Sequence, residues 1–198
     1  MIEYVINRIS GEAMSTLLRE IEVKYRVAEP SELARTLTTR GAVFSEPVRQ
    51  DDQAYAVNGW TYGQSKAGAA FARLRTENGR HTFCVKKPLE NELACAEHET
   101  EVVERESMHA AILAMGFYPT TRIVKSRRTA RIDDMLLCID EVDGLGAFFE
   151  IEVLVEDDRS AVEVQQELDR FARTLGVELV RSTETYDSLM RAAVPVGG

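Results

Sequence analysis

Residues 20–24 read Glu-Ile-Glu-Val-Lys, a strict alternation of charged and apolar side chains. Successive side chains of a β-strand point to opposite faces, so Glu20, Glu22 and Lys24 share one face while Ile21 and Val23 share the other. The apolar face must pack against a core. The charged face combines carboxylates, which can hold a hard cation, with a lysine, which can meet phosphate.

The same alternation returns in later segments that read as strands, each with apolar residues at the intervening positions. An ordinary half-exposed sheet would place these charges in water. The alternative is a sheet that closes with its polar side inward, which removes the exposed edges and can enclose a ligand. An interior with both signs of charge is costly when empty, so it predicts a metal-bound polyphosphate. The acids are Glu20, Glu22, Glu99, Glu101, Asp140, Glu150 and Glu152, and the bases are Lys24, Arg73, Arg75, Lys86, Lys125 and Arg127.

Bulk composition is that of a globular protein, with 198 residues of which 44% are hydrophobic. No apolar run is long enough to span a bilayer and no signal-peptide pattern begins the chain, so we expect a cytoplasmic protein. The net charge of −9 argues against nucleic-acid and anionic-membrane partners but permits a small polyanion. Cys84, Cys95 and Cys138 form no metal-binding spacing and are expected to pack as reduced thiols.

Turn and helix signals between the strands predict one α+β domain over residues 17–192, with residues 1–16 as an extension and 193–198 as a tail. Asn78-Gly79 predicts a hairpin. Asp157 or Asp158 is expected to cap a helix, and the glycine-containing segment 58–69 is expected to be flexible. The predicted strands are 20–28, 50–57, 70–77, 81–87, 97–103, 122–132, 135–142 and 147–155, and the predicted helices are 31–40, one that ends near 115, 160–175 and 184–192.

Taken in order, these motifs resemble the signatures of the CYTH superfamily, the triphosphate tunnel metalloenzymes, over roughly residues 17–190. Residues 20–24 match the Glu-x-Glu-x-Lys signature, and Lys87 departs from the pattern at a position where the family has glycine. The other similar segments are Ala72-Arg-Leu-Arg75, Lys86-Lys-Pro88, His98-Glu-Thr-Glu101, Lys125-Ser-Arg127, Asp140-Glu-Val-Asp-Gly-Leu-Gly146, Phe149-Glu-Ile-Glu152 and Tyr186-Asp-Ser-Leu189.

The resemblance implies a closed eight-stranded antiparallel β-barrel with peripheral helices, which binds a triphosphate together with Mg²⁺ or Mn²⁺. It implies that Glu20, Glu22, Glu150 and Glu152 hold the metal, with Asp140 as a further ligand or an orienting group. The phosphate-binding residues would be Lys24, Arg73, Arg75, Lys86, Lys125 and Arg127, and the catalytic candidates are Lys24, Arg127 and Glu22. Glu99 and Glu101 would either support the metal ligands from behind or neutralise the basic residues.

Two reactions remain open. Class IV adenylyl cyclases of this superfamily convert ATP to cyclic AMP and pyrophosphate, whereas its triphosphatases cleave inorganic or thiamine triphosphate. The run from Asp140 to Glu152 is similar to the cyclase branch, and the chain ends soon after Tyr186, so we expect a cyclase first and a triphosphatase second. A homodimer is expected by analogy with the cyclases.

Two non-enzymatic readings also remain. A noncatalytic nucleotide- or polyphosphate-binding module would lack the metal carboxylates, and a lipocalin-like carrier would need an apolar interior. Tyr55, Trp60 and Tyr62 are candidates for stacking on a base, with core packing as the alternative. Removal of Lys24 or Arg127 is expected to cut activity with little unfolding, and Glu150→Gln is expected to raise the metal requirement.

Overall fold

The computed structural model describes residues 18–156 and 159–193, which form one antiparallel sheet and four helices. None of these helices is long and apolar enough to cross a bilayer. The predicted extension 1–16, the predicted cap at Asp157 or Asp158 and the end of the predicted tail lie outside the described residues. Ser160 occupies the N-cap position of the helix that follows.

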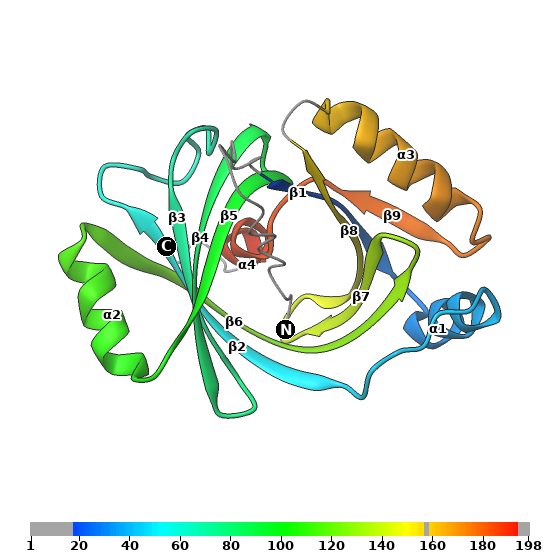
Figure 1. The fold of residues 1–198 in the computed structure, drawn as a ribbon, viewed down its shortest axis with the longest axis horizontal. Helices are drawn as coiled ribbons and strands as arrows, with labels where there is room; N and C mark the ends of the chain where they lie inside the picture. Colours follow the sequence, from blue (N-terminus) through cyan, green and yellow to red (C-terminus); the bar gives the residue numbers. More distant parts are fainter. Residues whose placement is uncertain (1–17, 157–158, 194–198) are drawn as a thin grey trace, which may run out of the picture.

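The sheet closes on itself, as predicted (Figure 1). Its strand order is β5-β4-β3-β2-β6-β7-β8-β1-β9, and an additional pairing between β5 and β1 completes a ring of eight strands. The ring strands are β1 (Leu18–Val27), β2 (Val48–Val57), β3 (Phe71–Glu77), β4 (Arg80–Asn91), β5 (Ala94–Val102), β6 (Phe117–Ile132), β7 (Met135–Val142) and β8 (Gly146–Glu156).

β1 closes the ring because it pairs with three strands. One edge pairs with β8, whereas the other pairs with β5 along Arg19–Ile21 and with β9 (Leu179–Ser182) along Lys24–Val27. The short strand β9 was not predicted. The predicted hairpin between β3 and β4 is confirmed, and Asn78 and Gly79 take the positive φ values of 50° and 75° that a tight hairpin turn needs.

The apolar core lies outside the ring, under two helices. Ile21, Val23 and Ile151 are fully buried and belong to a cluster with Leu33 of α1 (Pro30–Thr39) and Leu168 of α3 (Ala161–Arg173). Figure 1 shows both helices against the outer wall of the ring. Burying each large aliphatic side chain contributes about 1.5–3 kcal/mol. The apolar face of β1 therefore points outward, which turns its charged face toward the interior.

Helix α4 (Tyr186–Ala193) lies within the outline of the ring in Figure 1. Tyr186 and Leu189 are buried in a cluster with Ile123, Val142 and Phe148, and the rings of Tyr186 and Phe148 meet edge to face with centroids 5.1 Å apart. The helix thus brings an apolar face to the inner side of the strands.

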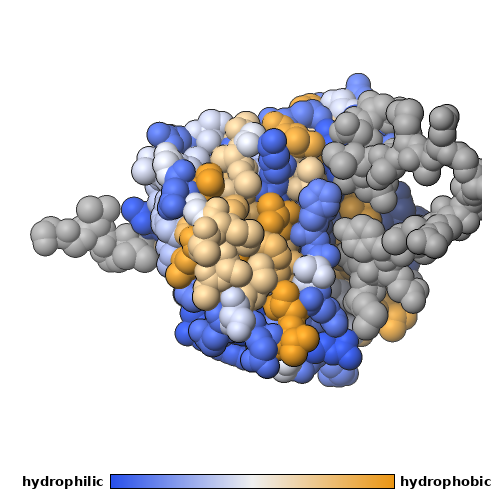
Figure 2. All heavy atoms as spheres, turned by 60° about the vertical axis from the view of Figure 1, so that its left-hand side comes forward, coloured by the Kyte–Doolittle hydropathy of each residue, from blue (hydrophilic) through white to orange (hydrophobic). Residues whose placement is uncertain are grey.

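The outer side that carries α2 (Arg105–Ala114) shows an apolar patch with hydrophilic residues around it (Figure 2). Val103, Leu113 and Met115 are exposed on this side. Between α2 and the strands, Tyr55 packs with Leu74 and Ile112.

Candidate metal and phosphate site

The predicted charged side chains meet inside the ring. Arg127 of β6 contacts Glu150 of β8, although β7 lies between these strands. Lys86 Nζ of β4 lies 2.7 Å from Glu20 Oε1 of β1, although β5 lies between them. These contacts span the intervening strand on the face opposite the buried outer cluster of Ile21, Val23 and Ile151, so the charged faces line the lumen.

Three acids of the lumen repel one another. Glu20 and Glu22 share one face of β1, and Glu22 lies directly opposite Glu152 on β8. Burial raises the pKa of Glu20 to about 8; Lys86 opposes this shift, and the charges of Glu97, Glu152 and Glu22 add to it. Burial also raises the pKa of Glu152 to about 7, against the pull of Arg127 and with the help of Glu150 and Glu22.

The acidic triad Glu20, Glu22 and Glu152 has the donor chemistry that a hard divalent cation requires. Carboxylate oxygens are the ligands that Mg²⁺ and Mn²⁺ prefer. A cation among them would replace the mutual repulsion with attraction and lower the raised pKa values of Glu20 and Glu152. The chemistry of these donors therefore fits the metal that the sequence predicts, and Glu152 also has a ligand atom within 4.8 Å of one from Glu150 and one from Cys138.

The acids of the triad also have cation partners, but in the other two acids assigned to the metal the cations outweigh burial and lower the pKa. Asp140 accepts hydrogen bonds from Lys125 Nζ at 2.7 Å, from Arg127 Nε at 2.6 Å and from the Tyr186 hydroxyl at 2.9 Å. Burial opposes ionisation of Asp140, but Arg127 and Lys125 outweigh it and hold the pKa of Asp140 below its usual value. Asp140 thus has the contacts of the orienting group that was the alternative to a metal ligand.

Glu150 is held in the same way. Its Oε1 lies 3.1 Å from Lys24 Nζ, and Arg127 contacts its other oxygen. Burial again opposes ionisation, but Lys24 and Arg127 keep the pKa of Glu150 well below the usual range. Glu150 and Asp140 therefore fix the positions of Lys24, Lys125 and Arg127 in the metal-free protein.

The remaining predicted bases also have acidic partners. Arg75 donates two hydrogen bonds of 2.7 Å to Asp52, and Arg73 Nη2 lies 3.0 Å from Glu99 Oε2. Lys86 Nζ lies 2.7 Å from Glu97 Oε2 in addition to its contact with Glu20. A bound polyanion must therefore exchange with the carboxylates that hold these cations.

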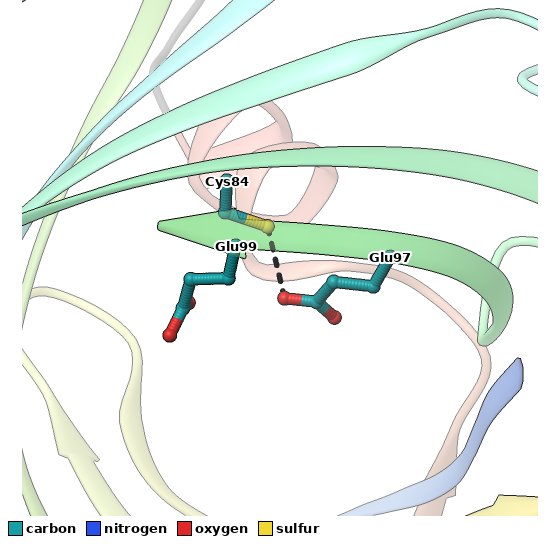
Figure 3. Close-up of side chains that lie close together, drawn as sticks. All are labelled: Cys84, Glu97 and Glu99. Carbon is teal, nitrogen blue, oxygen red and sulfur yellow. Dashed lines mark hydrogen bonds between the residues drawn. The ribbon is translucent and has the colours of Figure 1, made fainter. Parts of the chain in front are cut away.

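Sequence reasoning missed Glu97 as part of the lumen, where it lies beside Cys84, which shares a strand face with Lys86 (Figure 3). The Cys84 thiol donates to Glu97 Oε1 at 2.9 Å, and Glu99 lies beside them, so that one ligand atom from each residue falls within 4.8 Å of the others. Burial raises the pKa of the Cys84 thiol. Glu97 lies two residues before Glu99 and therefore points to the same face of its strand, so the alternation of side chains would have identified it. Asp52 was missed as well.

Glu99 and Glu101, which were assigned the same role from sequence, differ in their surroundings. Glu99 contacts Arg73 in the lumen, whereas the Glu101 side chain is 65% exposed and lies 3.5 Å from Arg80. A second mixed group, Cys138 with Glu150 and Glu152, also has ligand atoms within 4.8 Å of one another. The cysteines are buried, as expected for packed thiols, but Cys84 and Cys138 face carboxylates.

The three aromatic candidates for base stacking have other contacts. Tyr55 is buried under α2, and its hydroxyl lies 2.7 Å from His109 Nδ1. Trp60 is buried against Phe71, and the Tyr62 hydroxyl donates to Asp187. Core packing and structural hydrogen bonds, the alternative reading, describe all three.

The stability of the metal-free protein should fall as pH rises from about 4.5 to about 8. Glu20 and Glu152 have raised pKa values, so in this window the folded state binds protons that the unfolded state has already lost. Raising the pH removes these protons and destabilises the folded state. Melting temperatures measured between pH 5 and pH 8 should show this slope, and saturating Mn²⁺ should remove most of it. Equal slopes with and without Mn²⁺ would contradict the assignment of Glu20, Glu22 and Glu152 as metal ligands.

Comparison with known proteins agrees with this architecture. A family model described as "CYTH domain" matches residues 18–186. A protein of Methanocaldococcus jannaschii named "Putative adenylate cyclase" is 26% identical over 160 residues, which cover 80% of this chain and 90% of the relative.

Solved structures show the same fold. A protein from Pyrococcus horikoshii superposes with a TM-score of 0.74 at 24% identity, covering 88% of this chain and 99% of its own. A protein from Hippeastrum, described as a "Putative adenylyl cyclase" with a dominant triphosphatase activity, has a TM-score of 0.59 at 15% identity and covers 90% of this chain and 98% of its own.

Proposed function

The chain belongs to the CYTH domain family, and from that premise we propose that it is a metal-dependent enzyme that cleaves a triphosphate. One observation carries the proposal: in a single lumen, the acidic triad Glu20, Glu22 and Glu152 lies beside a set of buried cations. A metal ion alone would need only the acids, and a polyanion alone would need only the bases. The two together suit a metal–triphosphate complex.

We assign the roles as follows. Glu20, Glu22 and Glu152 hold Mg²⁺ or Mn²⁺, which when bound polarises phosphate oxygens as a Lewis acid. The arginines suit phosphate because their planar guanidinium group can donate two parallel hydrogen bonds, whereas each lysine acts as a point charge. The proposed phosphate-binding residues are Lys24, Arg73, Arg75, Lys86, Lys125 and Arg127.

Substrate binding exchanges partners within this set. Lys24 and Arg127 are paired with Glu150 in the absence of ligand. Phosphate oxygens take over these two cations, which are already pointed into the lumen and therefore need little reorganisation. Lys24 and Arg127 then offset the negative charge that develops on the phosphate being cleaved.

The first candidate reaction is conversion of ATP to cyclic AMP and pyrophosphate. It is supported by the name of the Methanocaldococcus relative and by the run from Asp140 to Glu152. This reaction requires the ribose 3′-hydroxyl to lie in line with the α-phosphorus.

The second candidate is hydrolysis of inorganic or thiamine triphosphate. It is favoured by the contacts of Tyr55, Trp60 and Tyr62, which are all engaged in packing or hydrogen bonds within the protein. Inorganic triphosphate needs no base-stacking surface. A noncatalytic module ranks below both reactions because the carboxylates of the triad are retained, and a lipocalin-like carrier is inconsistent with a charged lumen.

Product identification tests the proposal. ATP, inorganic triphosphate and thiamine triphosphate are each incubated with the protein and Mg²⁺ or Mn²⁺, with the Glu22→Gln variant as the background control. Cyclic AMP with pyrophosphate supports the first reaction, and orthophosphate supports the second. If none of the three substrates gave a metal-dependent product, the proposal that the protein is an enzyme would be contradicted.

Three further expectations also stay proposals: a cytoplasmic location, a single domain over residues 17–192, and a homodimer. The exposed apolar residues Val103, Leu113 and Met115 beside α2 offer a surface on which two copies could pack. Sedimentation of the purified protein would distinguish a dimer from a monomer.

A further inference from the structure

The segment that joins β2 to β3, residues 58–70, forms a strap that is packed against the protein. It was expected to be a flexible connection. Instead, Trp60 is buried, its Nε1 donates to the Ser65 carbonyl at 3.1 Å, and its own carbonyl accepts from the Tyr118 hydroxyl at 2.7 Å. The Trp60 ring lies edge-on to Tyr62 and Phe71, with centroids 5.1 and 4.9 Å away.

The strap is bound to the beginning of α4. The Tyr62 hydroxyl lies 2.9 and 3.0 Å from the two carboxylate oxygens of Asp187. Lys66 Nζ donates to Thr185 Oγ1 at 2.8 Å and to Ser188 Oγ at 2.6 Å. Two side chains of the strap therefore hold the first turn of α4.

Placing the charged side chain of Lys66 here is energetically costly if its contacts serve only to hold the structure together. Its side chain is only 6% exposed, and it lies at a helix N-terminus, where the helix dipole disfavours a cation. Glu92, at 3.0 Å, is the ion-pair partner of Lys66 within residues 18–156 and 159–193. Because α4 is too short to be stable alone, such anchors set its position.

The opposite side of the same helical turn meets the proposed phosphate site. The Tyr186 hydroxyl donates to Asp140 at 2.9 Å. Lys24 Nζ lies 4.3 Å and Lys125 Nζ 4.7 Å from the centre of the Tyr186 ring. A shift of the first turn of α4 would therefore change the surroundings of both ammonium groups.

We propose that Lys66 and Tyr62 are positioning residues for triphosphate binding. Through Thr185, Asp187 and Ser188 they fix the first turn of α4. That turn fixes Tyr186, whose contacts act together with those of Glu150 and Asp140 to place Lys24 and Lys125 for phosphate. This inference rests on the proposed function, because it assumes that those two lysines bind the triphosphate.

Calorimetric titration of a non-hydrolysable imido analogue of inorganic triphosphate into the protein, with saturating Mn²⁺ present, tests the strap without turnover. Lys66→Met should weaken binding about tenfold, a change of about 1.4 kcal/mol, at unchanged stoichiometry. Tyr62→Phe changes no charge and should weaken binding about threefold, since Asp187 keeps its bond from Thr120. Lys87→Met, which removes an exposed lysine, should stay within about twofold of wild type.

Two outcomes would overturn the positioning role. One is a Kd of Lys66→Met within twofold of wild type. The other is a loss of stoichiometry at unchanged Kd, which would mean that Lys66 only keeps the protein folded. Wild-type protein that binds no analogue in the presence of Mn²⁺ would instead contradict the proposed function itself. Emission of Trp60, the chain's single tryptophan, should shift to longer wavelength in Lys66→Met as the strap loosens.

Discussion

Arg127→Ala should lower turnover about a thousandfold and lower the free energy of unfolding of the metal-free protein by about 3 kcal/mol. Arg127 donates to Asp140 through Nε and Nη2, both at 2.6 Å, and also contacts Glu150. Its Nη1 lies 3.5 Å from Glu152. Removal of Arg127 takes away a phosphate donor and leaves the buried carboxylates of Asp140 and Glu150 with one lysine each as counterion.

This expected loss of stability corrects the prediction made from sequence, where removal of a cation from a basic cluster should relieve repulsion. In the structure Arg127 lies among acids, so its removal increases repulsion instead. Steady-state kinetics and chemical denaturation measure the two effects. Arg122→Ala is the matched control, since Arg122 lies on the same strand but is exposed outside the ring. Full turnover in Arg127→Ala would show that the phosphate assignment is wrong, and unchanged stability would show that the buried pairs do not form.

Glu152→Gln and Glu150→Gln should have opposite effects on the stability of the metal-free protein. Glu152 has a raised pKa among other acids, so its neutral replacement should stabilise the protein at pH 8. Glu150 is the counterion of Lys24 and Arg127, so its replacement should destabilise the protein. Thermal melts at pH 8 without metal compare the two variants.

Metal titration completes this comparison. Glu152→Gln should weaken Mn²⁺ binding at least about tenfold, because it removes one ligand of the acidic triad. Glu150→Gln should raise the metal requirement by less, since cations already occupy its carboxylate. An unchanged titration of Glu150→Gln would remove Glu150 from the metal site. Equal metal affinity in Glu152→Gln and wild type would refute the acidic triad.

The closed ring was predictable because the face to which each side chain of a strand points depends only on its position in that strand. Glu20, Glu22 and Lys24 had to share a face opposite Ile21 and Val23, and the buried outer cluster confirms which face packs. The strand β9 was not predictable in this way. It has only four residues, and β1 supplies the edge on which it pairs.

Charge balance inside the ring was beyond sequence reasoning because it depends on contacts across the lumen. Glu150 and Glu152 have the same parity on one strand, yet Glu150 ionises readily beside Lys24 whereas burial and neighbouring acids raise the pKa of Glu152. The role of Lys66 likewise depends on a contact with a helix that lies far along the chain. Its neighbours in sequence, mostly small residues and glycines, indicated only a loose connection.

A crystal structure with Mn²⁺ and a non-hydrolysable imido analogue of inorganic triphosphate tests the central claim most directly. We predict an anomalous manganese peak in contact with carboxylates of Glu20, Glu22 and Glu152, and analogue oxygens on Lys24, Lys125 and Arg127. Manganese or analogue bound only outside the ring, with the lumen ion pairs intact, would contradict the account.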